Sequence, residues 1–319
     1  MSKVLVLFSC LILFTSHPVF GQQTQSQEEY QKQLKEHEKK VAEIEAKNAE
    51  KRAELEKIKT ENQKKELYNS ANRAYKIRNY SQALNFYNQV LDIDACFTKA
   101  LYGKGLALNK LRNYSAAVEA FEAATECDPT YARAYWGMGA NQKKLQQLDK
   151  AVASFDKAVK VDPTYSKAYY EKGLILKQQK NFSGAEATFK AAIEAEPDYA
   201  QAHAALGDTY LDQRKTKLAI SSLKKSVELN ASARPYYRLA EAYNQSGQHE
   251  AAIDAAKAAI NVKRNYAPAA FEAGVAYKAL TSYNDALKYF QISLKDKGWR
   301  KVAQYEIDRI KEEIKKSAN

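Results

Sequence analysis

An alanine recurs along this chain at an almost constant interval, and this repeat constrains the fold more than any other feature of the sequence. Small residues recur twelve positions before it, and bulky ones four positions after it, with Ala256 as an exception. Fixed spacing of this kind indicates one supersecondary unit repeated along the chain. The alanines, at steps of 34, 34, 34, 34, 33 and 34 residues, are Ala83, Ala117, Ala151, Ala185, Ala219, Ala252 and Ala286.

The pattern predicts two antiparallel helices in each unit. We expect the small residue of the first helix to meet the alanine of the second, where the two backbones approach closely, and the bulky residue to fill the space one turn further along. Pro129, Pro163 and Pro197 follow an acidic residue and should end the second helix. Each pair leaves an apolar face that only the next pair can cover, so the units must stack.

These residues resemble the tetratricopeptide repeat family, most closely in Tyr135–Gly139 and Ala151–Phe155. The resemblance covers about 64–297 as seven units and implies an all-α, right-handed α-solenoid. Ala71 replaces the usual glycine, and Ala95, Ala231 and Arg264 replace the usual proline, so we expect the local geometry to differ at these positions. The apolar spacing in 298–319 predicts a C-terminal capping helix, with a binding helix for another protein as the alternative.

The first 21 residues have the layout of a secretory signal peptide. Lys3 precedes an apolar run from Val4 to Phe14, and small or modest residues precede a cut before Gln22. The run is shorter than the roughly 20 residues that a transmembrane helix needs. A buried helix and an uncleaved anchor are the alternatives. We expect an exported protein, periplasmic in the first place, with a secreted or envelope-associated location as the alternative, and no transmembrane segment in the mature chain.

Residues 22–63 are predicted to form a charged helix. Strong helix formers dominate, without Gly or Pro, and 28–66 contains eleven acidic and eleven basic residues. Sparse apolar residues fall on heptad positions, interrupted by polar ones. Two interpretations stay open: an oligomerising coiled coil, giving self-association through 28–66, or a solvated single helix held by charge pairs. The heptad residues are Leu34, Val41, Ile44, Asn48, Leu55, Ile58 and Asn62.

Cysteine and histidine are scarce, at three and four residues. This excludes a disulfide-dense domain and a four-cysteine zinc site. Cys96 and Cys127 would meet oxidising conditions in an exported protein, but their separation in space does not follow from the sequence. We therefore favour two independent small apolar residues at helix ends over a disulfide.

A basic, aromatic surface is predicted on the first helices of the repeats. In the family this surface commonly binds peptides, and the chain has a net charge of +12. The resemblance implies a groove for a protein or peptide segment that is acidic or contains aromatic residues. Two alternatives are aromatic residues that only pack between repeats, and adhesion to anionic envelope polymers or lipid head groups. The candidate groove residues are Lys99, Tyr102, Lys110, Arg133, Trp136, Lys143, Lys144, Lys167, Tyr170, Lys177 and Tyr237.

Catalytic and metal-binding motifs are absent from the sequence, including GxSxG, HExxH, CxxC and Walker sequences. We expect a non-enzymatic scaffold active in envelope assembly, with no cofactor, no metal and no nucleic-acid partner. Asn79, Asn113 and Asn181 begin Asn-x-Ser sequences at equivalent places in three units. We interpret them as turn residues.

Overall fold

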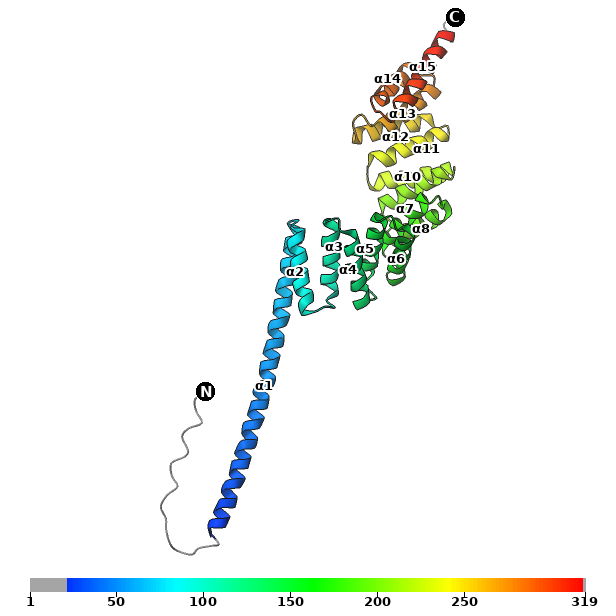
Figure 1. Cartoon of the computed structure of the whole chain (residues 1–319). Helices are drawn as coiled ribbons and strands as arrows, with labels where there is room; N and C mark the ends of the chain where they lie inside the picture. The colour runs from blue at the N-terminus through cyan, green and yellow to red at the C-terminus, as the bar shows by residue number, and fades with distance from the viewer. Residues whose placement is uncertain (1–21, 318–319) are drawn as a thin grey trace. The chain divides into compact units, whose positions relative to one another are not determined.

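The computed structural model describes residues 22–317, and within that range it contains fifteen α-helices and no strand (Figure 1). The predicted signal peptide lies outside the described residues. The helices are α1 (Gln22–Lys76), α2 (Tyr80–Ile93), α3 (Thr98–Lys110), α4 (Tyr114–Cys127), α5 (Ala132–Lys144), α6 (Leu148–Val161), α7 (Ser166–Gln178), α8 (Phe182–Ala195), α9 (Ala200–Asp212), α10 (Thr216–Leu229), α11 (Ala233–Gln245), α12 (His249–Val262), α13 (Ala267–Ala279), α14 (Tyr283–Leu294) and α15 (Arg300–Ser317).

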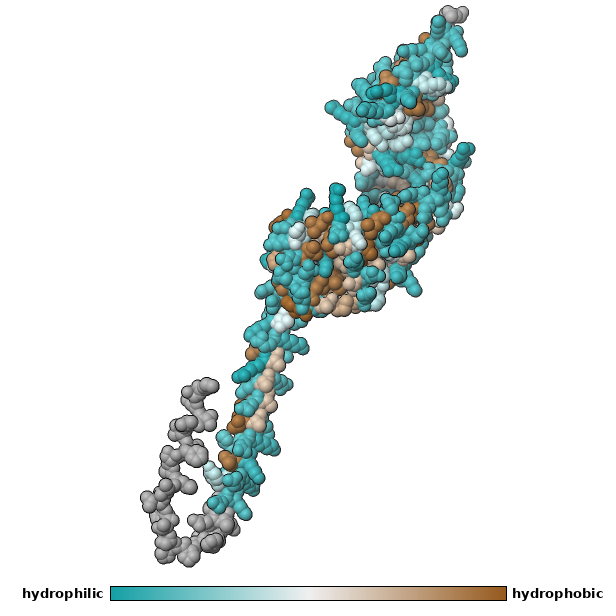
Figure 2. All heavy atoms as spheres, in the orientation of Figure 1, coloured by the Kyte–Doolittle hydropathy of each residue, from teal (hydrophilic) through white to brown (hydrophobic). Residues whose placement is uncertain are grey.

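The chain divides into two units, residues 1–66 and 67–319, and α1 contributes to both. No helix end falls at the predicted boundary between residues 63 and 64, because the charged helix continues as the first helix of the first repeat. Side chains from 27 to 63 are all exposed. Figure 2 shows apolar residues scattered along the largely hydrophilic surface of α1. Pairs such as Glu36 with Lys40, 2.9 Å apart, support the helix along its exposed surface.

Helices from residue 67 onward stack as consecutive pairs, beginning with the end of α1 against α2 and ending with α13 against α14. Each second helix also contacts the first helix of the next pair. All seven recurring alanines are fully buried, as the repeat pattern predicts. The all-α fold is therefore confirmed as an α-solenoid of stacked helix pairs.

Four of the recurring glycines, Gly105, Gly139, Gly173 and Gly274, lie closest to a phenylalanine ring of the second helix, which adds a partner to the contact expected with the alanine. Gly207 lies closest to Leu223 and next to the backbone oxygen of its repeat alanine, Ala219. A Cβ added to Gly139 would lie 2.7 Å from Phe155 Cε1, and one added to Gly105 would lie 2.6 Å from Phe121 Cε1. Carbon atoms do not approach this closely, so each ring occupies the space of the missing side chain. The sixth pair carries Ala240 instead of glycine, and its ring is replaced by Ala256.

Asn79, Asn113 and Asn181 are helix N-caps, which refines their interpretation as turn residues. Their side chains accept hydrogen bonds from the backbone N–H groups of Gln82, Ala116 and Gly184, respectively. These contacts satisfy N–H groups that have no partner inside the helix. The asparagines therefore fix where α2, α4 and α8 begin.

Helix α15 covers the end of the last pair. Ala303, Ile307 and Ile310 are buried and form one apolar cluster with Ala286 and Phe290 of α14. The capping prediction agrees with this packing. Two other apolar residues of this helix, Val302 and Ile314, are exposed instead, with exposed fractions of 46% and 38%.

The structure pairs Cys96 with Cys127, so the prediction of two independent cysteines is wrong. The Cα atoms are 5.4 Å apart and the sulfur atoms form a disulfide. Cys96 follows α2 and Cys127 ends α4. Because consecutive repeats stack in register, residues about one period apart meet at the same end of neighbouring pairs. The separation of 31 residues was the signal that sequence reasoning did not use.

Candidate peptide-binding surface

The first-helix face is defined here by the predicted groove residues of α3, α5, α7 and α11. Contacts between α3 and α5, and among α7, α9, α11 and α13, make the first helices of neighbouring repeats part of one surface. Five of the predicted cations are exposed, whereas Lys143 and Lys177 are half-buried, as are the four predicted aromatic residues. The exposed cations are Lys99, Lys110, Arg133, Lys144 and Lys167.

Each predicted aromatic residue packs against an aromatic residue from the loop that precedes the next first helix. Tyr102 meets Tyr131 edge to face, with ring centroids 5.3 Å apart, and Tyr170 meets Tyr199 at 5.2 Å. These contacts are geometries that aromatic pairs favour. The aromatic row comprises Tyr68–Phe97, Tyr102–Tyr131, Trp136–Tyr165, Tyr170–Tyr199, Tyr237–Tyr266 and Phe271–Trp299.

Trp136 packs against Tyr165, but its indole nitrogen Nε1 is buried and has no hydrogen-bond partner among the described residues. An unpaired buried donor costs about 1–3 kcal/mol. The ring is therefore held by apolar packing. The aromatic row lies on the first-helix face and also packs between neighbouring repeats. Its position is therefore compatible with a binding surface and with a role in packing alone.

Arg133 lies among the tyrosines of the row. Burial raises the pKa of Tyr165 to about 12, and the positive charge of Arg133 opposes that rise. Burial also raises the pKa of Tyr102 and of Tyr131, again against the effect of Arg133. These phenols therefore stay neutral in any physiological buffer. The surface can offer phenol hydroxyls and one guanidinium side by side.

Two of the predicted cations are neutralised by carboxylates. Lys143 Nζ donates to Glu171 Oε2 over 2.8 Å, and Lys177 Nζ lies 3.1 Å from Asp212 Oδ2. Glu171 was not predicted from the sequence because it directly follows Tyr170 and is not one of the candidate groove positions. Among the described residues, Lys99 and Lys167 have no ion pair. Fewer of the predicted cations are therefore available to a ligand than the sequence indicated.

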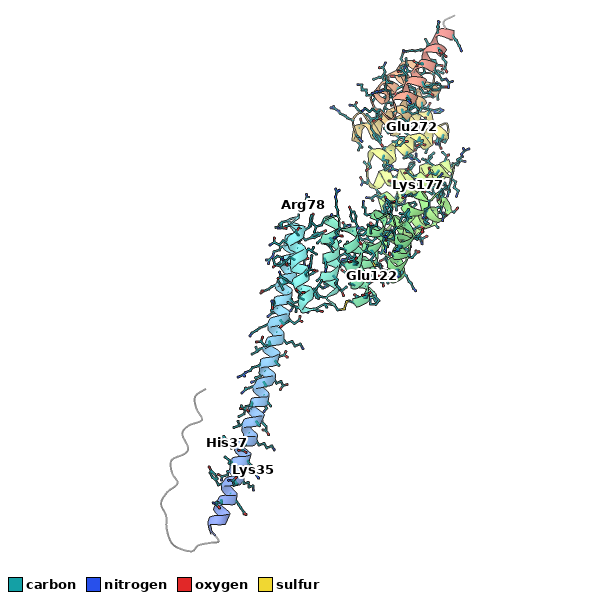
Figure 3. All side chains as sticks on the ribbon, in the orientation of Figure 1. Lys35, His37, Arg78, Glu122, Lys177 and Glu272 are labelled. Carbon is teal, nitrogen blue, oxygen red and sulfur yellow. A yellow bond between two sulfur atoms is a disulfide. The ribbon has the colours of Figure 1, made fainter. Side chains whose placement is uncertain are left out.

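Asp208 of α9, a buried carboxylate, is the centre of a charge cluster. Its Oδ1 accepts a hydrogen bond from Arg238 Nε at 2.9 Å, and its Oδ2 accepts one from Arg234 at 3.1 Å. Arg238 also donates to Glu241 at 2.6 Å. Figure 3 labels Lys177, which contributes to the cluster from α7. Cations and carboxylates balance here, in contrast to the exposed cations of α3 and α5.

Glu272 of α13 is a buried carboxyl group, labelled in Figure 3. Its Oε2 accepts a hydrogen bond from Asn244 Nδ2 at 2.9 Å. Burial raises the pKa of Glu272 to about 7, and Glu241 raises it further while Asn244 and Arg238 oppose the rise. This group titrates in a range where most glutamates are fully ionised. It is a pH-sensitive contact between α11 and α13.

The described residues contain no cluster of three or more His, Cys, Asp or Glu side chains able to hold a metal ion. None of the helices in the described range is both long and apolar enough to cross a membrane. His203 has a structural contact, with Nε2 2.8 Å from the carbonyl oxygen of Pro197.

Comparison with known protein families finds tetratricopeptide repeats over most of the helical stack. Two family models with this description match, one over residues 144–209 and the other over 68–132 and 204–270. Together they cover more than half of the chain. The chain belongs to the tetratricopeptide repeat family. No curated protein matches it significantly.

Solved structures agree with this fold. The C-terminal part of a tetratricopeptide repeat protein from Cytophaga hutchinsonii superposes with a TM-score of 0.61 and 19% identity, covering 75% of this chain and 99% of that one. PilF of Pseudomonas aeruginosa gives 0.56 at 18% identity, covering 68% and 97%. YrrB, described as a TPR protein with an unusual peptide-binding site, gives 0.54 at 23%, covering 59% and 97%. At these identities the similarity concerns the fold.

Proposed function

We propose that this protein is a non-enzymatic scaffold that binds an acidic, aromatic-containing polypeptide segment on its first-helix face. The observation that carries this proposal is the alternation of exposed cations with the aromatic row on α3, α5 and α7. Lys99, Arg133 and Lys167 occupy equivalent positions in three consecutive repeats. YrrB, which shares the fold, has a peptide-binding site according to its description. A carboxylate-rich segment would pair with these exposed cations, and its aromatic side chains would pack on the row.

The test uses poly(Glu,Tyr), an acidic copolymer with tyrosine, and poly-Glu without it. Labelled polymers are titrated with residues 22–319 in fluorescence polarisation at low and high salt. We expect poly(Glu,Tyr) to bind more tightly, and affinity to fall as salt rises, because exposed charges are screened. Equal affinity for both polymers would contradict the aromatic part of the proposal.

A matched pair of triple variants separates the groove from general surface charge. Lys99→Glu, Arg133→Glu and Lys167→Glu alter the first-helix face, whereas Lys150→Glu, Lys217→Glu and Lys224→Glu alter exposed lysines of second helices. Both sets change the net charge by the same amount. We expect the first set to weaken binding at least tenfold and the second to leave it nearly unchanged. Equal losses would favour the alternative function, adhesion to anionic polymers or lipid head groups.

Export to the cell envelope is part of the same proposal. It is supported by the signal-like pattern of residues 1–21 and by the Cys96–Cys127 disulfide, since disulfides persist in oxidising compartments. Fractionation of the source cells, with N-terminal sequencing of the mature chain, tests it. A start at Gln22 in an extracytoplasmic fraction is the expected result, and a cytoplasmic protein that retains Met1 would refute it.

Self-association through α1 is proposed as the source of multivalency. Its support is an exposed apolar series at heptad positions, in which Ile44 and Leu55 have exposed fractions of 58% and 57%. Val41→Glu with Ile44→Glu should convert an oligomer to a monomer in analytical ultracentrifugation. A wild-type protein that stays monomeric at high concentration would favour the solvated single helix.

A further inference from the structure

The aromatic row is interrupted once, in the fifth repeat. In the other repeats, the first helix and the loop before the next first helix each contribute one ring. The equivalent positions of the fifth repeat hold Ala204 in α9 and Ser232 before α11. Two rings are therefore missing at the same place between two stacked repeats.

A pocket of about 410 Å³ lies at this interruption. Ala204 and Ser232 both line it, so the pocket occupies the side of the stack where the missing pair would be. This volume lies in the range of about 300–1,000 Å³ that is usual for ligand pockets. An aromatic side chain that entered it would bury about 150–250 Å². Its apolar lining includes Tyr170, Leu174 and Pro235. The row continues on both sides, with Tyr170–Tyr199 before the pocket and Tyr237–Tyr266 after it.

The polar lining of the pocket favours a ring that carries a hydroxyl group and is flanked by an acid. Asp208 lines the pocket as a buried carboxylate acceptor, and Lys177 lines it too. Arg234 uses one nitrogen on Asp208, while 74% of its side chain is exposed. A guanidinium has five N–H donors, so Arg234 can also bind a carboxylate outside the pocket.

We propose that this pocket, which we call the fifth-repeat pocket, receives a tyrosine side chain of a partner polypeptide, next to an acidic residue held by Arg234. The partner's ring takes the place that the chain's own rings take in the other repeats. This inference deepens the proposed function, on which it rests, by naming the anchor residue and its place. It concerns a pocket lined by α7, α9 and α11, and it uses none of the cations Lys99, Arg133 and Lys167 that carry the main proposal.

The probe is the capped peptide Ac-Asp-Tyr-Asp-NH2, with Ac-Asp-Ala-Asp-NH2 as its control. Binding to residues 22–319 is measured by saturation-transfer NMR and by titration. We expect saturation of the tyrosine ring, and an affinity at least tenfold higher than that of the alanine peptide. Equal binding of the two peptides, or no saturation of the ring, overturns the proposal.

Ala204→Tyr restores the residue that other repeats carry and fills the pocket from inside. It should abolish saturation of the peptide ring while leaving the helical far-UV signal unchanged. Ala187→Tyr, at an exposed position of α8, is the matched control and should bind like the wild type. Ser232→Tyr closes the pocket from its other wall and replaces Ala204→Tyr if that variant does not fold. Unchanged binding in the filled variant overturns the proposal.

The Lys99, Arg133 and Lys167 triple variant distinguishes the two proposals. It should weaken poly(Glu,Tyr) binding but leave the tripeptide in the fifth-repeat pocket. If the polymer binds to the wild type but the tripeptide does not, the fifth-repeat pocket is rejected. If the tripeptide binds but the polymer does not, binding on the first-helix face of α3–α7 is rejected. If the occupant is instead a second copy of this chain, Ala204→Tyr will lower the mass measured by ultracentrifugation, which also rejects a partner peptide.

Discussion

Gly139→Ala tests whether the glycines of the repeat exist to admit an aromatic ring. An added Cβ would lie 2.7 Å from Cε1 of Phe155 and 2.9 Å from both Cδ1 and Cζ. The fully buried ring would have to retreat by several tenths of an ångström in a closely packed core. Overpacking of this kind costs about 1–3 kcal/mol. Alanine also gains about 1 kcal/mol over glycine inside a helix. We therefore expect a net loss of about 1 kcal/mol of unfolding free energy.

A double-mutant cycle with Phe155→Ala isolates the contact. Phe155→Ala alone should cost about 3–5 kcal/mol, because it leaves a cavity. In that background the clash is gone, so Gly139→Ala should stabilise the protein by about 1 kcal/mol through helix propensity alone. The coupling energy is then about 2 kcal/mol, within the range seen for residues in contact. The sixth repeat already combines Ala240 with Ala256.

Urea unfolding followed by circular dichroism measures the cycle, and the comparison requires that the dependence on urea stays constant among the variants. Gly173→Ala should have the same effect in the wild-type background, because its added Cβ would lie 2.6 Å from Cε1 of Phe189. The reasoning is refuted if Gly139→Ala has the same effect with and without Phe155. In that case the ring would not be the reason for glycine at this position.

Two further predictions concern the disulfide and the buried glutamate. Replacing Cys96 and Cys127 by serine should lower the unfolding free energy by about 2–4 kcal/mol, since chain entropy for a loop of this length gives about 3.7 kcal/mol. Urea midpoints with and without reductant check this, and identical midpoints would contradict it. For Glu272, the folded-state pKa of about 7 exceeds the ordinary value of 4.5, so the folded state binds the proton more tightly. Stability should fall by the order of 3 kcal/mol as pH rises from about 4.5 to 7. Glu272→Gln should remove this fall, and a wild-type stability that rises across the interval would contradict the assignment.

The repeat pattern was sufficient to predict the helix pairs because close packing leaves few residue types at the contact positions. The buried alanines, the bulky second-helix residues and the capping helix were all visible as spacing in one chain. Each of these features depends on contacts within one helix pair or with the next pair along the chain. The pattern did not show that the ring itself lies against the glycine, since the position of a ring depends on the separation of the two helices.

Features that join different repeats were not available from the pattern. The partner of Cys96 and the carboxylate that neutralises Lys143 are contacts between repeats. Residue types alone suggested a longer cationic surface than the structure contains. The absence of a ring at Ala204 is visible in the sequence, but only the stacked structure shows that Ser232 leaves the opposite position empty as well.

The class of fold follows from the sequence alone, because a period of about 34 residues with small and bulky residues in fixed phase can bury its apolar faces only by stacking. The tertiary structure decided which side chains of neighbouring repeats meet. These contacts between repeats include the ion pair that neutralises Lys143, the disulfide between Cys96 and Cys127, and the open fifth-repeat pocket. The physical reason is that such contacts depend on distances of a few ångströms between residues about 30 positions apart, which the register of stacking sets and residue type does not.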